Sequence, residues 1–473
     1  MKNSANKIPE KIKTIHLIAA CGTGMGALAC MLKDLGFEVT GSDQNVYPPM
    51  SRFLADKKIP IARGFKAENL SPRPDLVVVG NAVSKDNPEV QQMEAMGIAF
   101  CSMPQAINHF VARDKKVLLV TGTHGKTTTS SLLAWVLFEA GLDPSFIIGG
   151  ILQDFVSNYR LGRGDLIVLE GDEYDTAYFD KGPKFLHYDP FLTVLTSVEF
   201  DHADIFRDLA HVKEVFKKLA TGIAPENGLF AFDADKNIDR VLAAAHCRIA
   251  RYGQRSDSAW RLGPVEIKPP VIHFEVYYNN RLYGDFETRM PGTHNLLNTL
   301  AVIACAAALS IPKAAIKKAV ATFGGIKRRQ EIRGKNNGIT VIDDFAHHPT
   351  AVKETIKAIK PFCTKGRLIA VFEPRTNSSM RQIFQDVYPH CFDQADLVCI
   401  RKPPLLSKIP ADERFSSEKL VADLNQAGQN AFYFPDTDAI LDFLVEKTIP
   451  GDTILIMSNG GFDNIHERLL KRI

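Results

Sequence analysis

The stretch 116–141, KVLLVTGTHGKTTTSSLLAWVLFEAG, constrains the fold more than any other part of the chain. It joins an apolar, β-rich run to a helical pattern through a turn that contains Gly122 and Gly125 and ends in Lys126 and Thr127. A turn of this kind presents backbone N–H groups at the N-terminus of a helix, where a phosphate binds. We therefore predict a P-loop, with Lys126 on the terminal phosphates of a nucleotide and Thr127 on magnesium.

The match to the general P-loop pattern has one departure. Val120 stands five residues before Gly125, where the general pattern has a glycine. The alternative interpretation is a glycine-rich connection with a solvated lysine. The order of strand, Gly-Lys-Thr and amphipathic helix favours the phosphate site.

The same order of a β-rich run, a turn and a helical pattern occurs at three places, near residues 14, 116 and 338. Because strands alternate with helices, we expect an α/β fold with parallel sheets. A chain of 473 residues is too long for one core, so we predict three domains. The expected domains are a Rossmann-like N-terminal domain at 1–112, a central P-loop ATPase-type domain at 113–333 and a Rossmann-like C-terminal domain at 334–473.

The boundaries are placed in polar, charged segments at 109–116 and 328–338. Residues 269–292 alternate with a period of two around the turn NNRL, which predicts an antiparallel hairpin added to the central domain.

Composition argues against two classes of partner. A formal net charge of +3 gives no field that would favour nucleic acid or an anionic membrane as the main partner. The eight cysteines form no Cys-x-x-Cys pair, as expected of reduced thiols. No apolar run approaches the length that crosses a bilayer, and we expect a cytoplasmic protein that binds small molecules.

Acidic side chains follow two further strand-like runs. VLEGDEYD brings Glu170, Asp172, Glu173 and Asp175 to the end of one run, where open α/β sheets bind ligands. Carboxylates at such an edge hold Mg²⁺.

The run TVLTSVEFDHAD supplies a second acidic group. It contains Glu199, Asp201, His202 and Asp204, and we predict that His202 is a metal ligand within this carboxylate cluster. A purely structural histidine is the alternative, since magnesium prefers oxygen.

A second nucleotide-type turn, CGTGMG, lies near the N-terminus. Its glycines are Gly22, Gly24 and Gly26, and Asp43 follows a second strand-like run about twenty residues later, as in dinucleotide or nucleotide-diphosphate sites. A nucleotide-diphosphate site in addition to an ATP site indicates that ATP supplies energy and that the second diphosphate is part of a substrate. This combination is expected of a ligase.

Six motifs in order, GTHGKTT, EGDEYD, EFDHADIF, GTHNLLN, KRRQEIRG and DDFAHHPTA, together resemble the ATP-dependent Mur (murein) ligases over nearly the whole chain. The resemblance implies a ligase that forms an amide bond in peptidoglycan metabolism. SDQNVYPPMS, GNAVSKDNPEV, FEPRTNS and MSNGGFDNIHERLL resemble the branch that joins UDP-N-acetylmuramate to the tripeptide L-alanyl-γ-D-glutamyl-meso-diaminopimelate in peptidoglycan recycling. The similar branch that adds L-alanine to UDP-N-acetylmuramate in de novo synthesis is the alternative.

The resemblance also implies roles for individual residues. Glu170 and His202 would hold a second magnesium ion, while Arg329, beside Arg328, would clamp phosphate. ATP would be bound by Gly122, Thr123, His124, Gly125, Lys126, Thr127, Thr128, Asn295, Asn298, Arg329 and either Asp343 or Asp344. The UDP substrate would be bound by Gly22, Thr23, Gly24, Gly26, Ser42 and Asp43. A helix cap for the asparagines and surface charge for the arginines are the alternatives.

Three assignments rest on less of the family pattern. Related ligases carry a carbamylated lysine some fifteen residues after the metal histidine; Lys217 stands there by count, but one gap would place Phe216 there instead. His348 and Asp344 are candidate general bases for the amine proton. Arg375, after the run RLIAVF, is a candidate for binding a carboxylate of the peptide, since a guanidinium forms two parallel hydrogen bonds with it.

Two function classes compete with a ligase. A nicotinamide oxidoreductase accounts for CGTGMG but leaves GTHGKTT without a role. A nucleotide sensor without turnover leaves the acidic and histidine cluster without a role. Within the ligase class, a folate- or cyanophycin-type relative is a further alternative, but it has no need for the diphosphate turn of the first domain.

Overall fold

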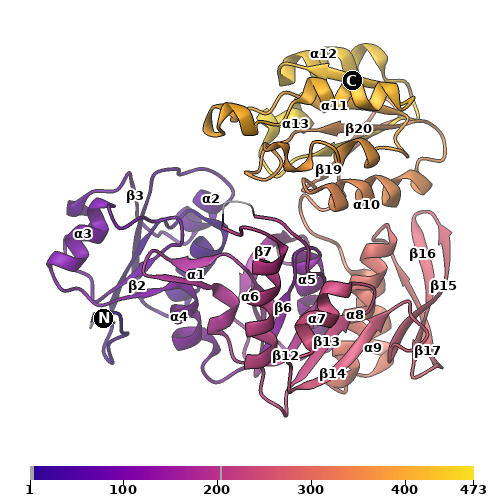
Figure 1. Cartoon of the computed structure of the whole chain (residues 1–473). Helices are drawn as coiled ribbons and strands as arrows, with labels where there is room; N and C mark the ends of the chain where they lie inside the picture. The colour runs from indigo at the N-terminus through magenta and orange to yellow at the C-terminus, as the bar shows by residue number, and fades with distance from the viewer. Residues whose placement is uncertain (1–4, 203–204) are drawn as a thin grey trace. The chain divides into compact units, whose positions relative to one another are not determined.

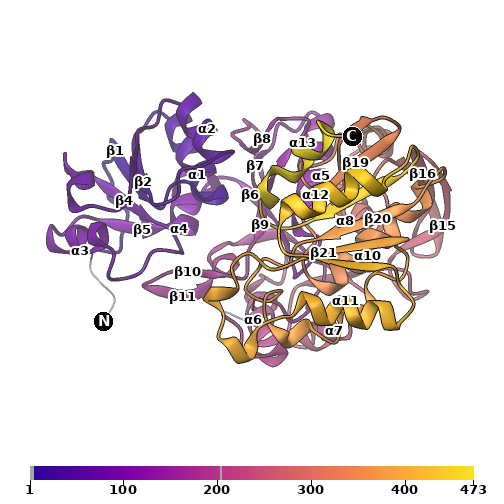
Figure 2. The same ribbon diagram turned by 90° about the horizontal axis from the view of Figure 1, so that it is seen from above.

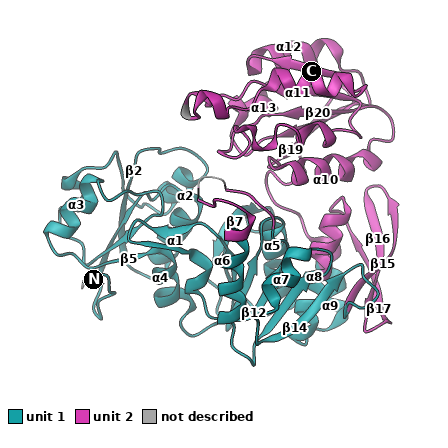
Figure 3. Cartoon of the chain, in the orientation of Figure 1, with its two compact units in different colours: residues 1–198, 212–259, 301–319 teal, residues 199–211, 260–300, 320–473 magenta. Residues whose placement is uncertain are grey.

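The computed structural model describes residues 5–202 and 205–473, which form two compact units. Unit 1 comprises residues 1–198, 212–259 and 301–319, and unit 2 comprises residues 199–211, 260–300 and 320–473 (Figure 3). Parallel strands alternate with helices along the chain (Figure 1), which confirms the predicted α/β class.

The first sheet of unit 1 is fully parallel, with the order β3-β2-β1-β4-β5. Its strands are β1 Thr14–Ile18, β2 Glu38–Asp43, β3 Ile61–Arg63, β4 Leu76–Val79 and β5 Phe100–Ser102. Its helices are α1 Thr23–Asp34, α2 Met50–Asp56, α3 Pro88–Ala95 and α4 Met103–Ile107, with the short 3-10 helix η1 Ala67–Leu70 and the short π-helix η2 Asn108–Ala112. Val77 and Val79 of β4 pack with Val90 and Met93 of α3, so the helix covers this face of the sheet.

The second sheet of unit 1 has the order β14-β13-β12-β6-β9-β7-β8, and only β8 runs antiparallel to its neighbour. Its strands are β6 Lys116–Thr121, β7 Ser145–Leu152, β8 Ser157–Arg160, β9 Leu166–Gly171, β12 Pro190–Leu195, β13 Gly228–Phe232 and β14 Arg248–Gly253. A separate hairpin joins β10 Asp175–Ala177 to β11 Asp180–Pro183, and η3 Lys184–His187 follows it. The further helices that belong wholly or mostly to unit 1 are α5 Lys126–Glu139, α6 Leu209–Gly222, α7 Lys236–Leu242 and α9 Lys313–Thr322.

Unit 2 contains an antiparallel meander of β15 Trp260–Lys268, β16 Val271–Tyr278 and β17 Arg281–Thr288. Asn279 and Asn280 form the two-residue turn between β16 and β17, and both have positive φ, of 48° and 61°. The predicted hairpin is therefore present, and a third strand, β15, precedes it. Helix α8, Thr293–Ala308, follows β17; its residues up to Leu300 belong to unit 2 and those from Ala301 onward to unit 1.

The third sheet lies in unit 2 and has the order β18-β19-β23-β20-β21-β22, with β18 antiparallel to β19. Its strands are β18 Glu331–Asn336, β19 Ile339–Asp344, β20 Leu368–Phe372, β21 Leu397–Arg401, β22 Ala431–Phe434 and β23 Thr453–Met457. Its α-helices are α10 Pro349–Ile359, α11 Ser417–Gln426, α12 Thr437–Lys447 and α13 Ile465–Leu470. The 3-10 turns are η4 Lys360–Phe362, η5 Gln382–Phe384, η6 Tyr388–His390, η7 Leu406–Lys408, η8 Ala411–Glu413 and η9 Phe462–Asn464.

Side chains of β20 point alternately to two cores, which shows that both faces of this sheet are covered. Leu368 and Phe372 pack with Leu420 of α11, while Ile369 packs with Leu441 of α12. Figure 2 shows the molecule from above, with β20 and β21 among these helices. The carboxyl ends of the parallel strands are thus the open part of the sheet, where α/β folds bind ligands.

Two further expectations can be compared with the structure. The predicted boundary between residues 333 and 334 falls inside β18, which pairs with β19. The boundaries of the three domains stay predictions. Among the described residues, no helix combines the length and the apolar character needed to cross a bilayer.

Candidate active site

The connection from β6 to α5 has the backbone form that the predicted P-loop requires. Gly122 and Gly125 both have positive φ, of 129° and 81°, and α5 begins at Lys126. A Cβ atom on Gly122 would lie 2.2 Å from Thr196 Oγ1, so no side chain fits there. The glycine lets the loop lie against the end of β12.

Two backbone amides of this loop, which we predicted to face a phosphate, already donate hydrogen bonds within the protein. The N–H of Thr123 donates to Ser197 O over 3.0 Å, and the N–H of His124 donates to Ser197 Oγ over 2.9 Å. Both amides are thus used to fix the loop, and a phosphate would bind mainly at the amides that open α5, from Gly125 onward.

Lys126 folds back over the loop and is 14% exposed. Its Nζ donates to both carboxylate oxygens of Glu173, at 3.1 and 2.9 Å, and to Gly122 O at 2.6 Å. Burial opposes the charge of the ammonium, but the carboxylates of Glu173, Asp172 and Glu170 outweigh it, so the pKa of Lys126 is raised. Lys126 is therefore a charged group held at the mouth of the loop.

Thr127 and Glu170 come together beside Lys126. In the register of β6 and β9, Glu170 lies opposite Val120, one residue from the strand ends. Thr127 Oγ1 donates to Glu170 Oε1 over 2.9 Å, and the N–H of Gly149 donates to Glu170 Oε2 over 2.7 Å. A hydroxyl and a carboxylate held side by side are hard oxygen donors, which fit Mg²⁺.

Two other acids of the EGDEYD motif have partners of their own. Asp172 Oδ2 accepts a 2.6 Å hydrogen bond from Lys184 Nζ. Burial opposes the charge of Asp172, but Lys184 outweighs this effect and lowers the pKa of the carboxyl. Asp175 Oδ2 lies 3.2 Å from the ammonium of Lys181. Of the three acids, Glu170 is the one that the Thr127 hydroxyl contacts.

The EFDHADIF motif belongs to unit 2 at residues 199–211. Glu199 Oε2 accepts a 2.8 Å hydrogen bond from Thr350 Oγ1. Asp201 is buried, which opposes its charge, but His202 and His347, together with the N–H group of His202, outweigh this effect and hold the pKa of Asp201 far below its usual value.

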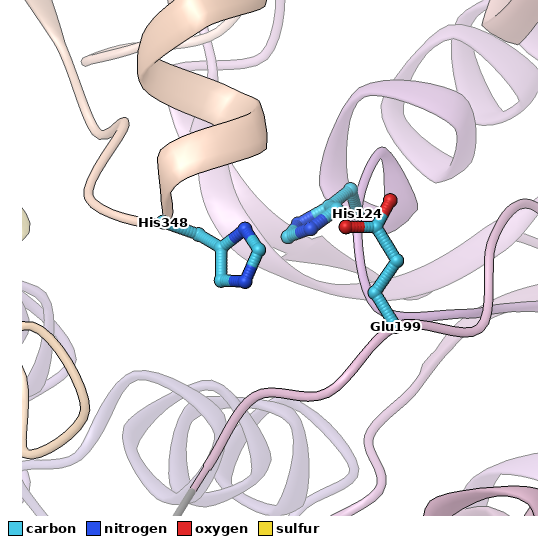
Figure 4. Close-up of side chains that lie close together, drawn as sticks. All are labelled: His124, Glu199 and His348. Carbon is cyan, nitrogen blue, oxygen red and sulfur yellow. The ribbon is translucent and has the colours of Figure 1, made fainter. Parts of the chain in front are cut away.

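His202 has a positive φ of 54°, and its N–H donates to Asp201 Oδ1 over 2.7 Å. Asp204 lies outside the described residues. Figure 4 draws Glu199 and His348 of unit 2 together with His124 of the P-loop in unit 1. The predicted metal ligands are thus divided, with Thr127 and Glu170 in unit 1 and His202 in unit 2.

The carbamylation candidates lie on different faces of α6. Phe216 is buried and its ring packs on Phe185 with centroids 5.3 Å apart, whereas Lys217 is exposed to solvent. A carbamate on Lys217 would therefore stand on the solvent face of the helix.

His348 is the N-cap of α10. Its Nδ1 accepts the N–H of Thr350 at 3.3 Å, and its Nε2 lies 3.2 Å from Phe200 O. These contacts require the neutral tautomer with the proton on Nε2. To act as the predicted base, His348 would have to release the amide of Thr350.

Arg328 and Arg329 stack on the same ring, that of Phe345, at 5.1 and 4.9 Å from its centroid. Arg328 Nη2 also donates to Ser458 O and Gly460 O, both at 2.6 Å. Arg328 therefore holds the loop after β23, and Arg329 is the better candidate for a phosphate.

Asp343 and Asp344 are both buried at the end of β19. Asp343 accepts from Arg333 at 3.0 Å, and Asp344 accepts from the amides of Gln330 and Ala346, both at 2.8 Å. Burial raises the pKa of Asp344. Each carboxylate thus already braces unit 2, and a role on the ribose stays a prediction.

The asparagines of the GTHNLLN motif lie in the first two turns of α8 and are largely buried. Asn295 Nδ2 donates to Pro291 O at 2.7 Å and to Gln330 Oε1 at 3.0 Å. Asn298 is 8% exposed. The contacts of Asn295 match the alternative of a structural residue at the helix start.

The glycine turn of the N-terminal sheet is braced by Asp43. Asp43 accepts the N–H groups of Cys21 and Asn45, both at 2.8 Å. Among the described residues, no atom beyond its two chain neighbours lies within 4 Å of a Cβ built on Gly22, so the turn has room there for a ligand. Thr23 O accepts a hydrogen bond from Asn158 of β8 at 3.1 Å.

Two other glycines of this turn lie against methionine side chains. A Cβ on Gly24 would lie 2.7 Å from Met103 Cε, and one on Gly26 would lie 2.7 Å from Met50 Cε. Their absent side chains therefore let α1 approach its neighbours.

Ser42 points to the interior. Its hydroxyl donates to Glu89 Oε2 at 2.6 Å, and Glu89 is fully buried beside His16 at 3.5 Å. Burial opposes the charge of Glu89, but His16, Ser42 and Asn69 outweigh this effect and lower its pKa. The sequence carries no motif that reveals this network.

Arg375 lies after β20 in unit 2. A Cβ on Gly460 would lie 2.2 Å from Arg375 Cδ, so the side chain packs directly on the loop after β23. Its Nη1 is 3.7 Å from Glu373 Oε1. The predicted peptide-binding residue is thus at the carboxyl edge of the sheet, as its position after the strand implies.

Three family models match the chain. They are the Mur ligase family catalytic domain at residues 14–115, the Mur ligase middle domain at 120–306, and the glutamate ligase domain of Mur ligases at 328–460.

Full-length relatives are also similar to this chain. The UDP-N-acetylmuramate–L-alanyl-gamma-D-glutamyl-meso-2,6-diaminoheptandioate ligase of Escherichia coli (strain K12) is 39% identical, covering 96% of this chain and 97% of that relative. The UDP-N-acetylmuramate–L-alanine ligase of Desulforamulus reducens is 32% identical, covering 99% of each chain. The crystal structure of a murein peptide ligase from Psychrobacter arcticus matches with a TM-score of 0.71 and 33% identity, covering 97% of this chain and 98% of that one. The chain belongs to the Mur ligase family.

Proposed function

We propose that this protein is an ATP-dependent ligase that joins UDP-N-acetylmuramate to the tripeptide L-alanyl-γ-D-glutamyl-meso-diaminopimelate in peptidoglycan recycling. The observation that carries the reaction type is the group of Lys126, Thr127 and Glu170 at the ends of β6 and β9. The choice of amine donor is supported by higher identity to two tripeptide ligases, 39% and 38%, than to L-alanine ligases, at 32% to 34%. ATP and UDP-sugars are cytoplasmic metabolites, so we place the reaction in the cytoplasm.

The reaction needs an activated carboxylate, because a free carboxylate does not acylate an amine in water. The γ-phosphoryl group of ATP is transferred to the muramoyl carboxylate, which gives an acyl phosphate and ADP. The α-amine of the tripeptide's L-alanine attacks the acyl carbon, and phosphate leaves as the amide bond forms. Lys126 is paired with Glu173 in the structure. When Lys126 binds the nucleotide instead, it stabilises the negative charge of the phosphoryl group during transfer.

Magnesium would be held by Thr127 and Glu170, and a second ion by Glu170 with His202, where it supplies charge neutralisation on the phosphates. Mn²⁺ would substitute as a second hard cation. Asn295, Asn298 and Arg329 would contact ATP, with Asp343 or Asp344 on the ribose. The amine proton would go to His348 Nδ1 after this atom releases the amide of Thr350.

The UDP part of the first substrate would bind at Gly22, Thr23, Gly24 and Gly26, with the turn braced by Asp43. Arg375 would bind a carboxylate of the peptide. We assign these tasks to three domains at 1–112, 113–333 and 334–473, the first for UDP-N-acetylmuramate, the second for ATP and the third for the amine donor.

The test is phosphate release from ATP in the presence of UDP-N-acetylmuramate, with the tripeptide and L-alanine offered in parallel. We expect release with the tripeptide, dependence on Mg²⁺, and loss of release on chelation by EDTA. Release with L-alanine and none with the tripeptide would assign the chain to the L-alanine-adding reaction instead. No release with either amine would contradict the ligase assignment.

A further inference from the structure

Four charged side chains gather at the carboxyl edge of the third sheet, and we call them the edge cluster. They are Glu373 and Arg375 after β20, Arg401 at the end of β21, and Asp463 in the loop after β23. All four belong to unit 2. Apart from Arg375, the ligase chemistry proposed above leaves them without a task.

Glu373 is the buried anchor of the edge cluster, with no exposed surface. Its Oε1 accepts from Ser458 Oγ at 2.7 Å and lies 3.7 Å from Arg375 Nη1, and its Oε2 accepts from Arg401 Nη1. One buried carboxylate thus orients both guanidinium groups, which is the arrangement that a buried charge requires.

Asp463 is also fixed by hydrogen bonds, but unlike Glu373 its side chain is half exposed, at 51%. Its Oδ2 accepts from Arg401 Nη2 at 2.7 Å and from Thr437 Oγ1 at 2.8 Å. Burial opposes the charge of Asp463, but Thr437, Arg401 and Arg375 outweigh this effect and lower its pKa. Asp463 is therefore an anion presented to solvent from a fixed position, in the field of Arg375.

The backbone around Asp463 is strained. Phe462, Asp463 and Asn464 have φ values of 44°, 49° and 55°, so three successive residues other than glycine lie in the left-handed region. Such conformations cost on the order of 1–3 kcal/mol each and persist where the surroundings over-determine them, often at ligand sites. The loop is thus kept in this form although an ordinary turn would be more stable.

The far end of the proposed tripeptide has matching chemistry. The distal carbon of meso-diaminopimelate bears an ammonium and a carboxylate together, so its recognition needs a fixed anion beside a fixed cation. Arg375 is 31% exposed and packs on Gly460, and Asp463 belongs to the same edge cluster. L-Alanine has only the amine that reacts, so it offers no second ammonium to this pair while that amine attacks.

We propose that Asp463, positioned by Arg401 and Thr437, binds the distal ammonium of diaminopimelate while Arg375 binds the adjacent carboxylate. This inference rests on the proposed tripeptide ligase function and assigns Asp463 as a residue that determines specificity for the third amino acid.

The experiment compares two amine donors, the diaminopimelate tripeptide and an analogue in which hydrogen replaces the distal amino group. We expect the wild type to favour the tripeptide by about tenfold or more in kcat/KM, since the analogue leaves Asp463 without its ammonium. Asp463→Asn should raise the KM for the tripeptide by about tenfold, leave the KM for the analogue unchanged, and so remove the preference.

The analogue reports on folding, because a variant with an intact KM for it is folded. Asp442→Asn is the matched control: Asp442 is an exposed acid of unit 2 that accepts a 2.7 Å hydrogen bond from Arg472, and both KM values should stay at the wild-type level. Asp463→Glu keeps the charge and should keep part of the preference.

Three outcomes would overturn the inference. They are a wild type with less than about threefold preference, an Asp463→Asn variant that raises both KM values equally, and one that lowers kcat while keeping the preference. A wild type that consumes L-alanine but neither peptide would instead overturn the proposed function, so the two failures are distinguishable.

Discussion

At the scale of single residues, the pair of Lys126 and Glu173 shows how a site group is held before its ligand binds. Glu173 is 3% exposed and Lys126 Nζ lies 2.9 Å from its Oε2. Desolvation of two charges is tolerable only while they remain paired. When Lys126 moves to bind a phosphate, it must therefore break its ion pair with Glu173, whose buried charge it stabilises.

This dependence predicts the result of a double-mutant cycle. Lys126→Ala should abolish phosphate release and also lower the free energy of unfolding by roughly 3 kcal/mol, because it leaves Glu173 buried without its ammonium partner. Adding Glu173→Gln should recover about 1–2 kcal/mol, since a neutral amide costs less to bury, without restoring turnover. Urea unfolding followed by circular dichroism gives both values. A Lys126→Ala variant with wild-type stability would contradict the buried pair.

The positions of side chains at strand ends were predictable from the sequence. Glu170 follows an apolar run, and the register of β9 with β6 brings it to Thr127, as a parallel sheet requires. The partner of Lys126 and the edge cluster were not predictable in this way. Glu173 contacts Lys126 across 47 positions and Asp463 contacts Arg401 across 62 positions, and no local pattern encodes such pairs.

At the scale of elements, the β6–α5 connection works only because Gly122 has no side chain. Its φ of 129° is unfavourable for other residues, and a Cβ would lie 2.2 Å from Thr196 Oγ1. The loop would have to move away from β12, and the hydrogen bonds from Thr123 and His124 to Ser197 would break with it. The opening of α5 would then lose its fixed position.

We expect Gly122→Ala to lower kcat/KM for ATP by at least about a hundredfold, because small misplacements at a phosphate site are costly. Gly141→Ala is the matched control, since Gly141 follows the other end of α5 with a φ of 77° and no atom within 4 Å of its Cβ. It should cost about 1 kcal/mol of stability and leave turnover unchanged. Steady-state kinetics over a range of ATP concentrations check both variants. An equal loss of kcat/KM for ATP in the two variants would contradict the role of the clash at Gly122.

Most helices and strands follow from their sequence pattern, but β15 does not. The structure places Gly263 and Pro264 inside this strand, at the shift of register between Leu262 and Val265. Glycine and proline weaken the pattern of a strand and favour a bulge, which is what this shift represents. The hairpin of β16 and β17 was predictable because its turn, Asn279-Asn280, has residues that tolerate positive φ.

At the scale of the whole molecule, the residues predicted to bind one nucleotide are divided between the two compact units. Gly122 to Thr128 belong to unit 1, whereas Asn295, Asn298 and Arg329 belong to unit 2. The described contacts already give Asn295 and Arg329 structural roles within unit 2. Whether both sets bind ATP is thus a question about coupling between the units.

Hydrogen–deuterium exchange with Mg²⁺ and a non-hydrolysable ATP analogue tests whether the predicted residues of both units bind ATP. At 100 times Kd the ligand stabilises its site by about 2.7 kcal/mol, so amides that exchange through opening of that site slow by up to about a hundredfold. We expect this slowing in peptides covering 122–128, 293–298 and 328–330, and no change in α12, which has no predicted nucleotide contact. The same analogue with Lys126→Ala should protect none of them. Protection confined to 122–128 would show that Asn295, Asn298 and Arg329 serve unit 2 alone, and that ATP is bound by the P-loop without them.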